Sequence, residues 1–298
     1  MKRLWLYFIA AVMSLGLVSC GGDDDTTEDT PEQKPQIVMT VTDTKNSITT
    51  AEMTIPYHEL SVSDGVGTSK PCLVLYLHGG TSAGNDNEKQ MGEPGIDSIA
   101  NYLKAHLKNA IMIVPQCPSR QYWIGPAKYV LNTLISQYVD DGKVDAKQIY
   151  IFGGSMGGTG TWGMLAAFPD LFAAAMPVAG DPSKVGEYTS KTPVLTVMGT
   201  ADVFMNMQNA IDFIAQLKAS GVDASIETEE GWTHEDTCKN SYTTQRLDKV
   251  FAHRRTDINY SSCFCFDKIK SSRLVVDLKV ILYLCIRLLK SGAGAKVP

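Results

Sequence analysis

Short apolar runs alternate with segments of helical spacing along most of the chain, and this alternation restricts the fold more than any other feature. The runs suit strands that are covered on both faces, and they occupy residues 71–77, 110–114, 148–152, 171–178, 193–198 and 224–228. Apolar side chains recur at helical spacing in residues 96–107, 129–138, 161–168, 205–217 and 242–251. Two β-like alternating segments, 36–44 and 52–62, come first. This order predicts an α/β fold with two leading antiparallel strands, a mostly parallel twisted sheet and helices on both faces.

The composition is that of a folded domain and excludes several classes of protein. Of the 298 residues, 44% are hydrophobic and 20% charged, so the chain can bury a core and is neither fibrous nor disordered. The formal net charge of -5 gives no basic surface for a polyanion, so we expect no nucleic-acid partner. Dinucleotide-binding, P-loop and zinc-protease motifs are absent from the sequence, and we therefore expect no cofactor and no metal.

The N-terminal residues have the pattern of an export signal followed by a tether. Two basic residues precede an apolar stretch over residues 4–18, which is short for a membrane span. Residues 17–20, Leu-Val-Ser-Cys, resemble the lipobox of bacterial lipoproteins, so we expect a signal peptide over residues 1–19 and lipidation of Cys20. The acidic segment 20–35 then forms a flexible tether. These features predict an outer-membrane lipoprotein of a bacterial envelope, either surface-exposed or facing the periplasm.

The motif G-x-S-x-G occupies residues 153–157, between a predicted strand and a predicted helix. In a strand-to-helix turn this spacing places the serine in a strained conformation with its hydroxyl exposed, and larger flanking residues would clash with the strand and helix. The following helix directs its first amides at the hydroxyl, so the Met156 N–H can donate to an oxyanion. The motif therefore predicts Ser155 as a nucleophile rather than a bystander in a glycine-rich turn.

A second glycine-rich turn, His-Gly-Gly-Thr at residues 78–81, follows the first buried strand. A turn at this place supplies the second oxyanion N–H in folds of this kind. We assign that N–H to Gly80, with Thr81 as the alternative. His78 is expected to be structural and bonded to nearby backbone, because it belongs to this turn.

A nucleophilic serine needs a base, and in the chain order serine, acid, histidine the base follows Ser155. Only His234 and His253 follow it. His253 falls in or just after the last predicted helix, whereas His234 lies in a loop after the strand 224–228. We predict His234 as the base.

The base needs a carboxylate to orient it. Asp202 follows the strand 193–198 through a short turn that would put its side chain at the same end of the sheet. Asp181, after the preceding strand, is the alternative. Glu235 and Asp236 adjoin the histidine and are expected to be solvated. Asp202 is the predicted acid.

Together these motifs resemble α/β-hydrolases of the secreted esterase group, which includes polyhydroxybutyrate depolymerase-like and feruloyl or acetylxylan esterase-like enzymes and is also grouped with predicted peptidases. The resemblance runs from about residue 71 to 251 and is carried by LYLHGGTSAGNDN, IVPQCP, QIYIFGGSMGGTGTW, MGTADVF and WTHED. It implies an α/β-hydrolase fold for a domain at 36–251, with Ser155, Asp202 and His234 as catalytic residues. Gly80 and Met156 match the oxyanion donors.

The resemblance also implies a substrate and an activity. The residues it places near the substrate are Thr81, Asn85, Asp86, Trp123 and Trp232. The expected activity is hydrolysis of carboxylic esters through an acyl-enzyme, with acyl or feruloyl groups on a polysaccharide, or a small ester, as substrate. A serine peptidase of the same fold and a non-catalytic glycan-binding lipoprotein are the alternatives. The expected partners are the ester substrate and the membrane that holds the lipid anchor.

Residues 252–298 differ in charge from the rest of the chain. They carry 9 basic and 3 acidic side chains, against 18 and 29 in residues 1–251. The longest unbroken apolar stretch, 280–286, is far too short to span a membrane. A packed amphipathic helix and an interfacial basic helix are possible, but the reversal of charge favours an aberrant extension.

Export permits disulfides among the remaining cysteines. Cys72 and Cys117 fall at opposite ends of two predicted neighbouring parallel strands, too far apart to be bridged. Cys117 and Cys238 fall at the same end of the sheet, so they are the expected pair if the domain has a bridge. The sequence does not assign a pattern.

We predict that deleting residues from Thr256 onward leaves turnover and thermal stability nearly unchanged, because the predicted domain is complete at residue 251. Thermal unfolding and initial rates of the full and truncated chains would check this. A loss of several kcal/mol, the size expected when a packed helix is removed from a core, would contradict the interpretation of the extension.

Overall fold

The computed structural model describes residues 37–256 except 68, 107 and 120. The predicted signal peptide, Cys20, the tether and all but the first residues of the C-terminal extension lie outside the described residues, as do Cys263, Cys265 and Cys285. Within the described part, no helix is both long and apolar enough to cross a bilayer.

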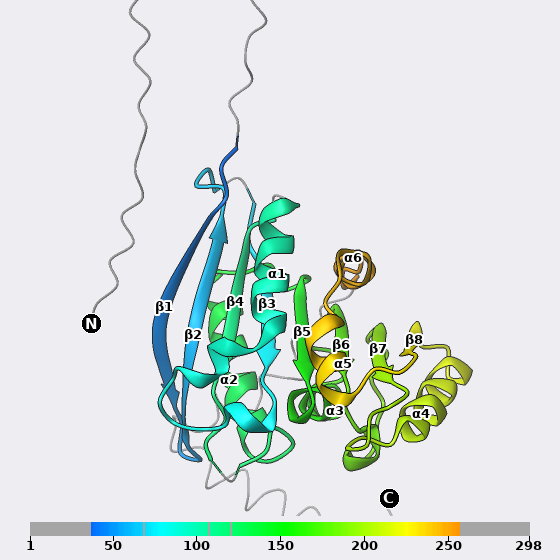
Figure 1. Cartoon of the computed structure of the whole chain (residues 1–298). Helices are drawn as coiled ribbons and strands as arrows, with labels where there is room; N and C mark the ends of the chain where they lie inside the picture. The colour runs from blue at the N-terminus through cyan, green and yellow to red at the C-terminus, as the bar shows by residue number, and fades with distance from the viewer. Residues whose placement is uncertain (1–36, 68, 107, 120, 257–298) are drawn as a thin grey trace, which may run out of the picture. The chain divides into compact units, whose positions relative to one another are not determined.

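A single mixed sheet forms the centre of the domain (Figure 1). Its described strands run in the order β1-β2-β4-β3-β5-β6-β7-β8. They are β1 (Thr40–Thr49), β2 (Thr54–Ser63), β3 (Cys72–Leu77), β4 (Ala110–Pro115), β5 (Ile149–Gly154), β6 (Ala174–Val178), β7 (Val194–Gly199) and β8 (Ala224–Glu229). β1 and β2 are antiparallel, β2 is antiparallel to β4, and all later neighbours are parallel. The predicted α/β architecture is therefore confirmed.

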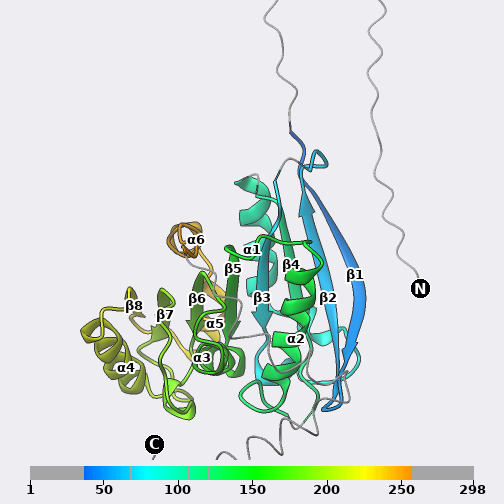
Figure 2. The same ribbon diagram turned by 180° about the vertical axis from the view of Figure 1, so that it is seen from behind.

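Helices cover both faces of this sheet (Figures 1 and 2). They are α1 (Pro94–Ala105), α2 (Ala127–Asp140), α3 (Met156–Ala167), α4 (Met207–Ala219), α5 (His234–Asn240) and α6 (Thr244–Phe251), with short 3-10 helices η1 (Gly80–Ser82), η2 (Lys89–Gly92) and η3 (Pro182–Lys184). Alternate residues of β3 enter different cores. Leu75 belongs to the core cluster that also contains residues of α2, α3 and α4, and Tyr76 belongs to the cluster that contains residues of α1 and α6. The continuous apolar runs of the sequence reflect this burial on both faces.

Two α-helices differ most from the sequence-based expectation. α3 begins at Met156 rather than at residue 161, because its glycine-rich first turns lack apolar periodicity and pack by close approach instead. α5 was not predicted. Its signal is the capping box between Thr233 and Asp236, in which each side chain accepts from the other residue's backbone N–H.

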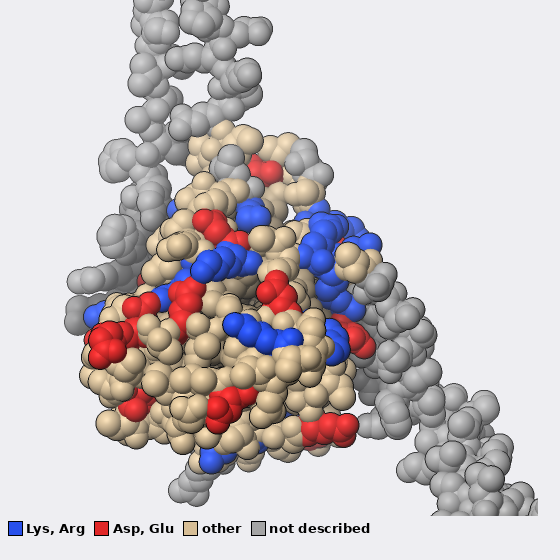
Figure 3. Space-filling model, turned by 90° about the vertical axis from the view of Figure 1, so that its right-hand side faces the viewer, with Lys and Arg blue, Asp and Glu red and all other residues tan. Residues whose placement is uncertain are grey.

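Ion pairs gather where α6 meets the edge strand β8. Arg246 contacts both Glu227 and Glu229, and Lys249 Nζ lies 2.6 Å from a carboxylate oxygen of Glu227. Figure 3, which faces this side of the domain, shows acidic and basic side chains together on the surface. Charged side chains on an edge strand oppose pairing with a strand of another chain.

The three described cysteines, Cys72, Cys117 and Cys238, are free. β3 and β4 are parallel neighbours, and this pairing places Cys72 and Cys117 at opposite ends of the two strands. The expected pair of Cys117 and Cys238 is wrong, because Cys117 belongs to the core on one face of the sheet and Cys238 packs against the core on the other. Burial raises the pKa of all three thiols to about 12, so they are protonated and unreactive at neutral pH.

α3 lies unusually close to the sheet, and glycine makes the approach possible. A Cβ on Gly157 would lie 1.8 Å from the backbone oxygen of Leu77, and one on Gly153 would lie 2.4 Å from the oxygen of Gly157. Both contacts are with backbone and cannot be relieved by a side-chain movement. The small residues expected around Ser155 are therefore a steric requirement of the fold.

We predict that Gly157→Ala lowers the free energy of unfolding by about 3 kcal/mol or more, because the added methyl must push α3 away from β3. Gly186→Ala is the matched control, since a Cβ there meets no atom within 4 Å. Urea unfolding of both variants would measure the difference, and equal stabilities would contradict the steric argument.

Candidate active site

Ser155 stands on a strained turn between β5 and α3. Its φ of 58° and ψ of -118° lie in a region that non-glycine residues rarely adopt. The Ser155 N–H donates to the backbone oxygen of Val178 on the neighbouring strand β6, at 3.0 Å. The strained turn expected from the G-x-S-x-G motif is present, and the adjacent sheet holds it in place.

The structure brings Ser155, His234 and Asp202 into one hydrogen-bonded row. His234 Nε2 lies 2.7 Å from Ser155 Oγ, and His234 Nδ1 lies 2.7 Å from Asp202 Oδ2. The Asp202 side chain is fully buried and that of His234 is 16% exposed. With Nδ1–H donating to the carboxylate, Nε2 is free to accept the serine proton.

The loop after β7 fixes the Asp202 carboxylate. Its Oδ1 accepts backbone N–H bonds from Phe204 at 2.8 Å and from Met205 at 3.0 Å, while Oδ2 faces the histidine. One carboxylate therefore shapes its own loop and orients the imidazole.

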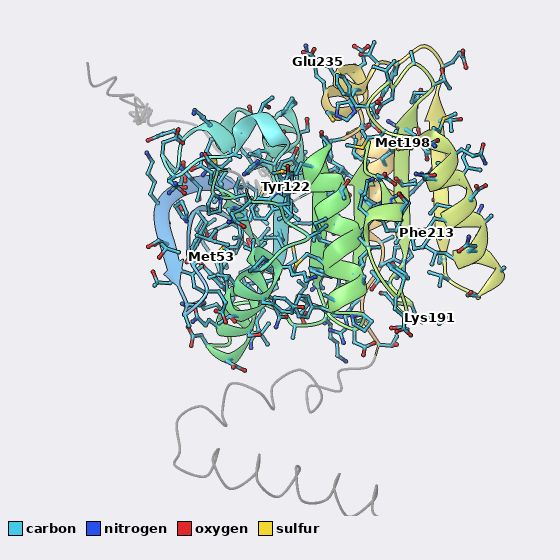
Figure 4. The ribbon with its side chains drawn as sticks, turned by 90° about the horizontal axis from the view of Figure 1, so that it is seen from below. Met53, Tyr122, Lys191, Met198, Phe213 and Glu235 are labelled. Atoms are coloured by element: carbon cyan, nitrogen blue, oxygen red, sulfur yellow. The ribbon has the colours of Figure 1, made fainter. Side chains whose placement is uncertain are left out.

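His234 is the first residue of α5 rather than part of an irregular loop. The Thr233 hydroxyl caps the helix by accepting from the Asp236 N–H at 3.2 Å. In Figure 4 two labelled residues mark the elements that carry the acid and the histidine. Met198 belongs to β7, which leads to the loop of Asp202, and Glu235 belongs to α5, which begins at His234. The capping box fixes the start of the helix from which the imidazole extends.

The turn after β3 lies against the serine. Leu77 pairs with Gly153, so the turns that follow β3 and β5 begin side by side. A Cβ on Gly79 would lie 3.6 Å from the Cβ of Ser155, whereas one on Gly80 would meet no atom within 4 Å. Gly80 and Met156 are each the first residue of a helix, where a backbone N–H has no acceptor within the helix. These two amides suit the oxyanion role assigned to them.

Glu93 contacts this turn and was not predicted from the sequence. Its Oε1 accepts from the Gly79 N–H at 3.1 Å and from the Ser82 hydroxyl at 2.6 Å. It precedes α1 and has no motif of its own, so only the fold reveals its contact with the turn.

His78 is structural, as expected. Its Nε2 accepts from the Cys117 N–H at 2.8 Å, and its Nδ1–H donates to the Gly79 oxygen at 2.6 Å. Burial lowers the pKa of His78 to about 4, so the imidazole is neutral at physiological pH. Its backbone oxygen accepts from Trp123 Nε1 at 3.0 Å.

The alternative acids and base are engaged elsewhere. Asp181 caps η3 and accepts from the Ser183 N–H; burial alone would raise its pKa, but this bond, one from Asn209 and nearby Lys184 lower it. Asp236 caps α5. His253 lies 3.7 Å from Asp223, a residue that precedes β8 and so lies away from its carboxyl end.

The predicted substrate-loop residues other than Trp123 divide into three groups. Thr81 and Asn85 are exposed. Asp86 braces the loop, where a hydrogen bond from Gln116 and two backbone N–H bonds lower its pKa to about 2. Trp232 is half-buried with its ring 5.8 Å from the guanidinium of Arg246.

The prediction for Trp123 is wrong. Its side chain is only 1% exposed, because the indole packs against Gly160 of α3 and lies edge-on to His78. Its large apolar ring therefore supports the oxyanion turn from the core and does not face a substrate.

Comparison with known proteins agrees with this geometry. The sequence model of the dienelactone hydrolase family matches residues 125–254, which include the serine, acid and histidine. A solved thermostable esterase superposes with a TM-score of 0.65 at 25% identity, covering 72% of this chain and 63% of that one. The chain has the α/β-hydrolase fold.

Two further proteins are similar to parts of this chain. A feruloyl esterase module from Clostridium thermocellum, solved with sinapinate, has a TM-score of 0.56 at 15% identity, covering 71% of this chain and 88% of that one. Protein usf of Aquifex pyrophilus is 30% identical over 90 residues, or 30% of this chain and 39% of that protein. The chain spans less than half the length of the curated relatives it matches.

We predict that His78 makes the folded domain less stable in mild acid. Its pKa is lower in the folded chain than the value of about 6.5 expected after unfolding, so the unfolded state binds the proton more readily. Stability should fall as the pH drops below 6.5, with this loss complete below about pH 4. Urea unfolding at pH 7 and pH 4.5 should show a loss larger by about 2 to 3 kcal/mol in the wild type than in His78→Gln. Equal losses in the two proteins would refute the prediction.

Proposed function

We propose that the chain is a serine hydrolase that cleaves carboxylic esters through an acyl-enzyme intermediate. The observation that carries this proposal is the continuous hydrogen-bonded row from the strained Ser155 through His234 to the buried Asp202. Nucleophile, base and orienting acid each lie within hydrogen-bond distance of the next, as acyl transfer requires. The esterase neighbours and the dienelactone hydrolase match support an ester as the scissile bond.

The first half-reaction forms the acyl-enzyme. His234 Nε2 removes the Ser155 proton as Oγ attacks the ester carbonyl, and the carbonyl oxygen takes the negative charge. The Gly80 and Met156 amides would stabilise that oxyanion. When the intermediate collapses, the ester C–O bond breaks and His234 protonates the departing alkoxide. Asp202 stabilises the imidazolium throughout.

The second half-reaction hydrolyses the acyl-enzyme and regenerates the free enzyme. Water takes the place of the alcohol beside His234. The imidazole removes a proton from this water as its oxygen attacks the acyl carbonyl. The acid product leaves with the acyl group, and Ser155 Oγ recovers its proton from the imidazolium.

The substrate proposal rests on the N-terminal sequence and on the resemblance of the motifs to secreted esterases. An acyl or feruloyl group on a polysaccharide suits a chain whose N-terminus resembles that of a lipoprotein, because a surface tether would hold the domain near an extracellular polymer. The feruloyl esterase module, at 15% identity, supports the fold and not the substrate. Export, lipid anchoring at Cys20 and residence in the bacterial envelope are part of this proposal.

Two other functions are less well supported. A serine peptidase would use the same row, and a peptidase is among the structural neighbours at 11% identity, which supports only the fold. A glycan-binding lipoprotein without activity would have no need to keep the strained serine, the base and the acid aligned. The intact hydrogen bonds therefore favour an enzyme.

We predict that a fluorophosphonate probe labels Ser155, and that Ser155→Ala abolishes the labelling. Asp202→Asn should lower kcat for 4-nitrophenyl acetate by about 10³-fold or more, because the amide no longer holds the imidazole in the reactive tautomer. Asp181→Asn is the matched control and should retain activity, since Asp181 has no contact with His234. Full activity in Asp202→Asn would contradict the assignment, and cleavage of peptides but not of feruloyl or acetylated xylan would favour the peptidase.

A further inference from the structure

Two large apolar side chains stand exposed directly beside the acid of the active site. Val203 is 87% exposed and Phe204 is 75% exposed. The ring of Phe204 lies 5.2 Å from the ring of His234, centroid to centroid. A single exposed apolar residue is ordinary, but two adjacent ones, of which Phe204 contacts the ring of His234, suit a surface that binds something apolar. We name this pair the apolar shelf.

The apolar shelf is held in place by the active site itself. Asp202 Oδ1 accepts hydrogen bonds from the backbone of Phe204 and of Met205, and the same carboxylate orients His234. The backbone that carries Phe204 cannot shift without disturbing the acid. The shelf is therefore preformed, and binding to it requires little ordering of the loop.

The chemistry of the row decides which part of an ester would meet the shelf. Under the proposed function, His234 Nε2 must protonate the departing alkoxide, so the alcohol oxygen comes within hydrogen-bond distance of the imidazole. The carbon skeleton of the alcohol then lies beside that ring. Phe204 contacts the same ring, whereas the acyl carbon is bonded to Ser155 and its oxygen points at the Gly80 and Met156 amides.

We propose that Val203 and Phe204 form a subsite for the alcohol portion of the ester, and that the enzyme favours esters whose alcohol has an apolar or aromatic face. This proposal rests on the proposed function and adds the part of the substrate that is selected. A sugar hydroxyl as leaving group fits the shelf through the apolar C–H face of its ring, and an aryl or benzyl alcohol fits it through the aromatic ring.

Benzyl acetate and methyl phenylacetate test the proposal because they are isomers with the benzyl group on opposite sides of the ester. Phe204→Ala should lower kcat/KM for benzyl acetate by about tenfold and leave that for methyl phenylacetate within about twofold. Phe204→Leu should keep most of the benzyl acetate activity, since it restores apolar surface. The rate of hydrolysis of the acetyl-enzyme should not change, because the alcohol has already left.

Val66→Ala is the matched control. Val66 is 66% exposed but follows β2 at the far end of its pairing with β4, near the amino end of the parallel strands. This variant should leave both substrates unaffected. Thermal unfolding of Phe204→Ala should match that of the wild type, because the side chain is exposed.

The remaining outcomes separate this proposal from the function on which it rests. Equal losses on the two isomers, a loss on methyl phenylacetate alone, or no loss would each overturn the subsite while leaving ester hydrolysis standing. Failure of the wild type to hydrolyse either isomer, together with no labelling of Ser155 by fluorophosphonate, would overturn both.

Discussion

The close approach of α3 to β3 is the constraint on which the rest of the site depends. Gly157 allows the helix backbone to meet the oxygen of Leu77, and the short turn at Ser155 is possible only at that distance. The serine is consequently forced to a positive φ, with its hydroxyl outside the sheet. The strain at this residue is sustained by the packing of two buried layers around it.

A second dependence runs through one carboxylate. Asp202 divides its two oxygens between the imidazole and the backbone of its own loop. Catalytic alignment and the placement of exposed apolar surface are therefore set by the same group. A change at this residue alters the loop as well as the base, whereas a change at Phe204 alters only the surface offered to a ligand.

Much of this architecture is readable from sequence, because buried strands and the residues at their ends follow simple patterns. The G-x-S-x-G motif predicts Ser155, and the chain order together with the preceding strands predicts His234 and Asp202; the structure places all three after the carboxyl ends of parallel strands. Other features escaped for physical reasons. The first turns of α3 pack through absent side chains and so leave no apolar periodicity, and Trp123 has a motif position that suggests a substrate contact although its ring fills the core. Glu93 lies 14 residues from Gly79 in the sequence, and only the fold brings the two into contact.

The serine, the acid and the histidine all come from β5 onward, while the turn that carries Gly80 follows β3 in the earlier half of the sheet. His78 connects that turn to the end of β4, because its Nε2 accepts from the Cys117 N–H. Its backbone oxygen also accepts a hydrogen bond from Trp123 Nε1. Under the proposed function, proton transfer and charge stabilisation thus reside in separate stretches of the chain that meet along the β3–β5 pairing. Sequence change in the loops after β3 and β4 can accordingly alter the surroundings of the Gly80 amide while the hydrogen bonds among Ser155, His234 and Asp202 stay in place.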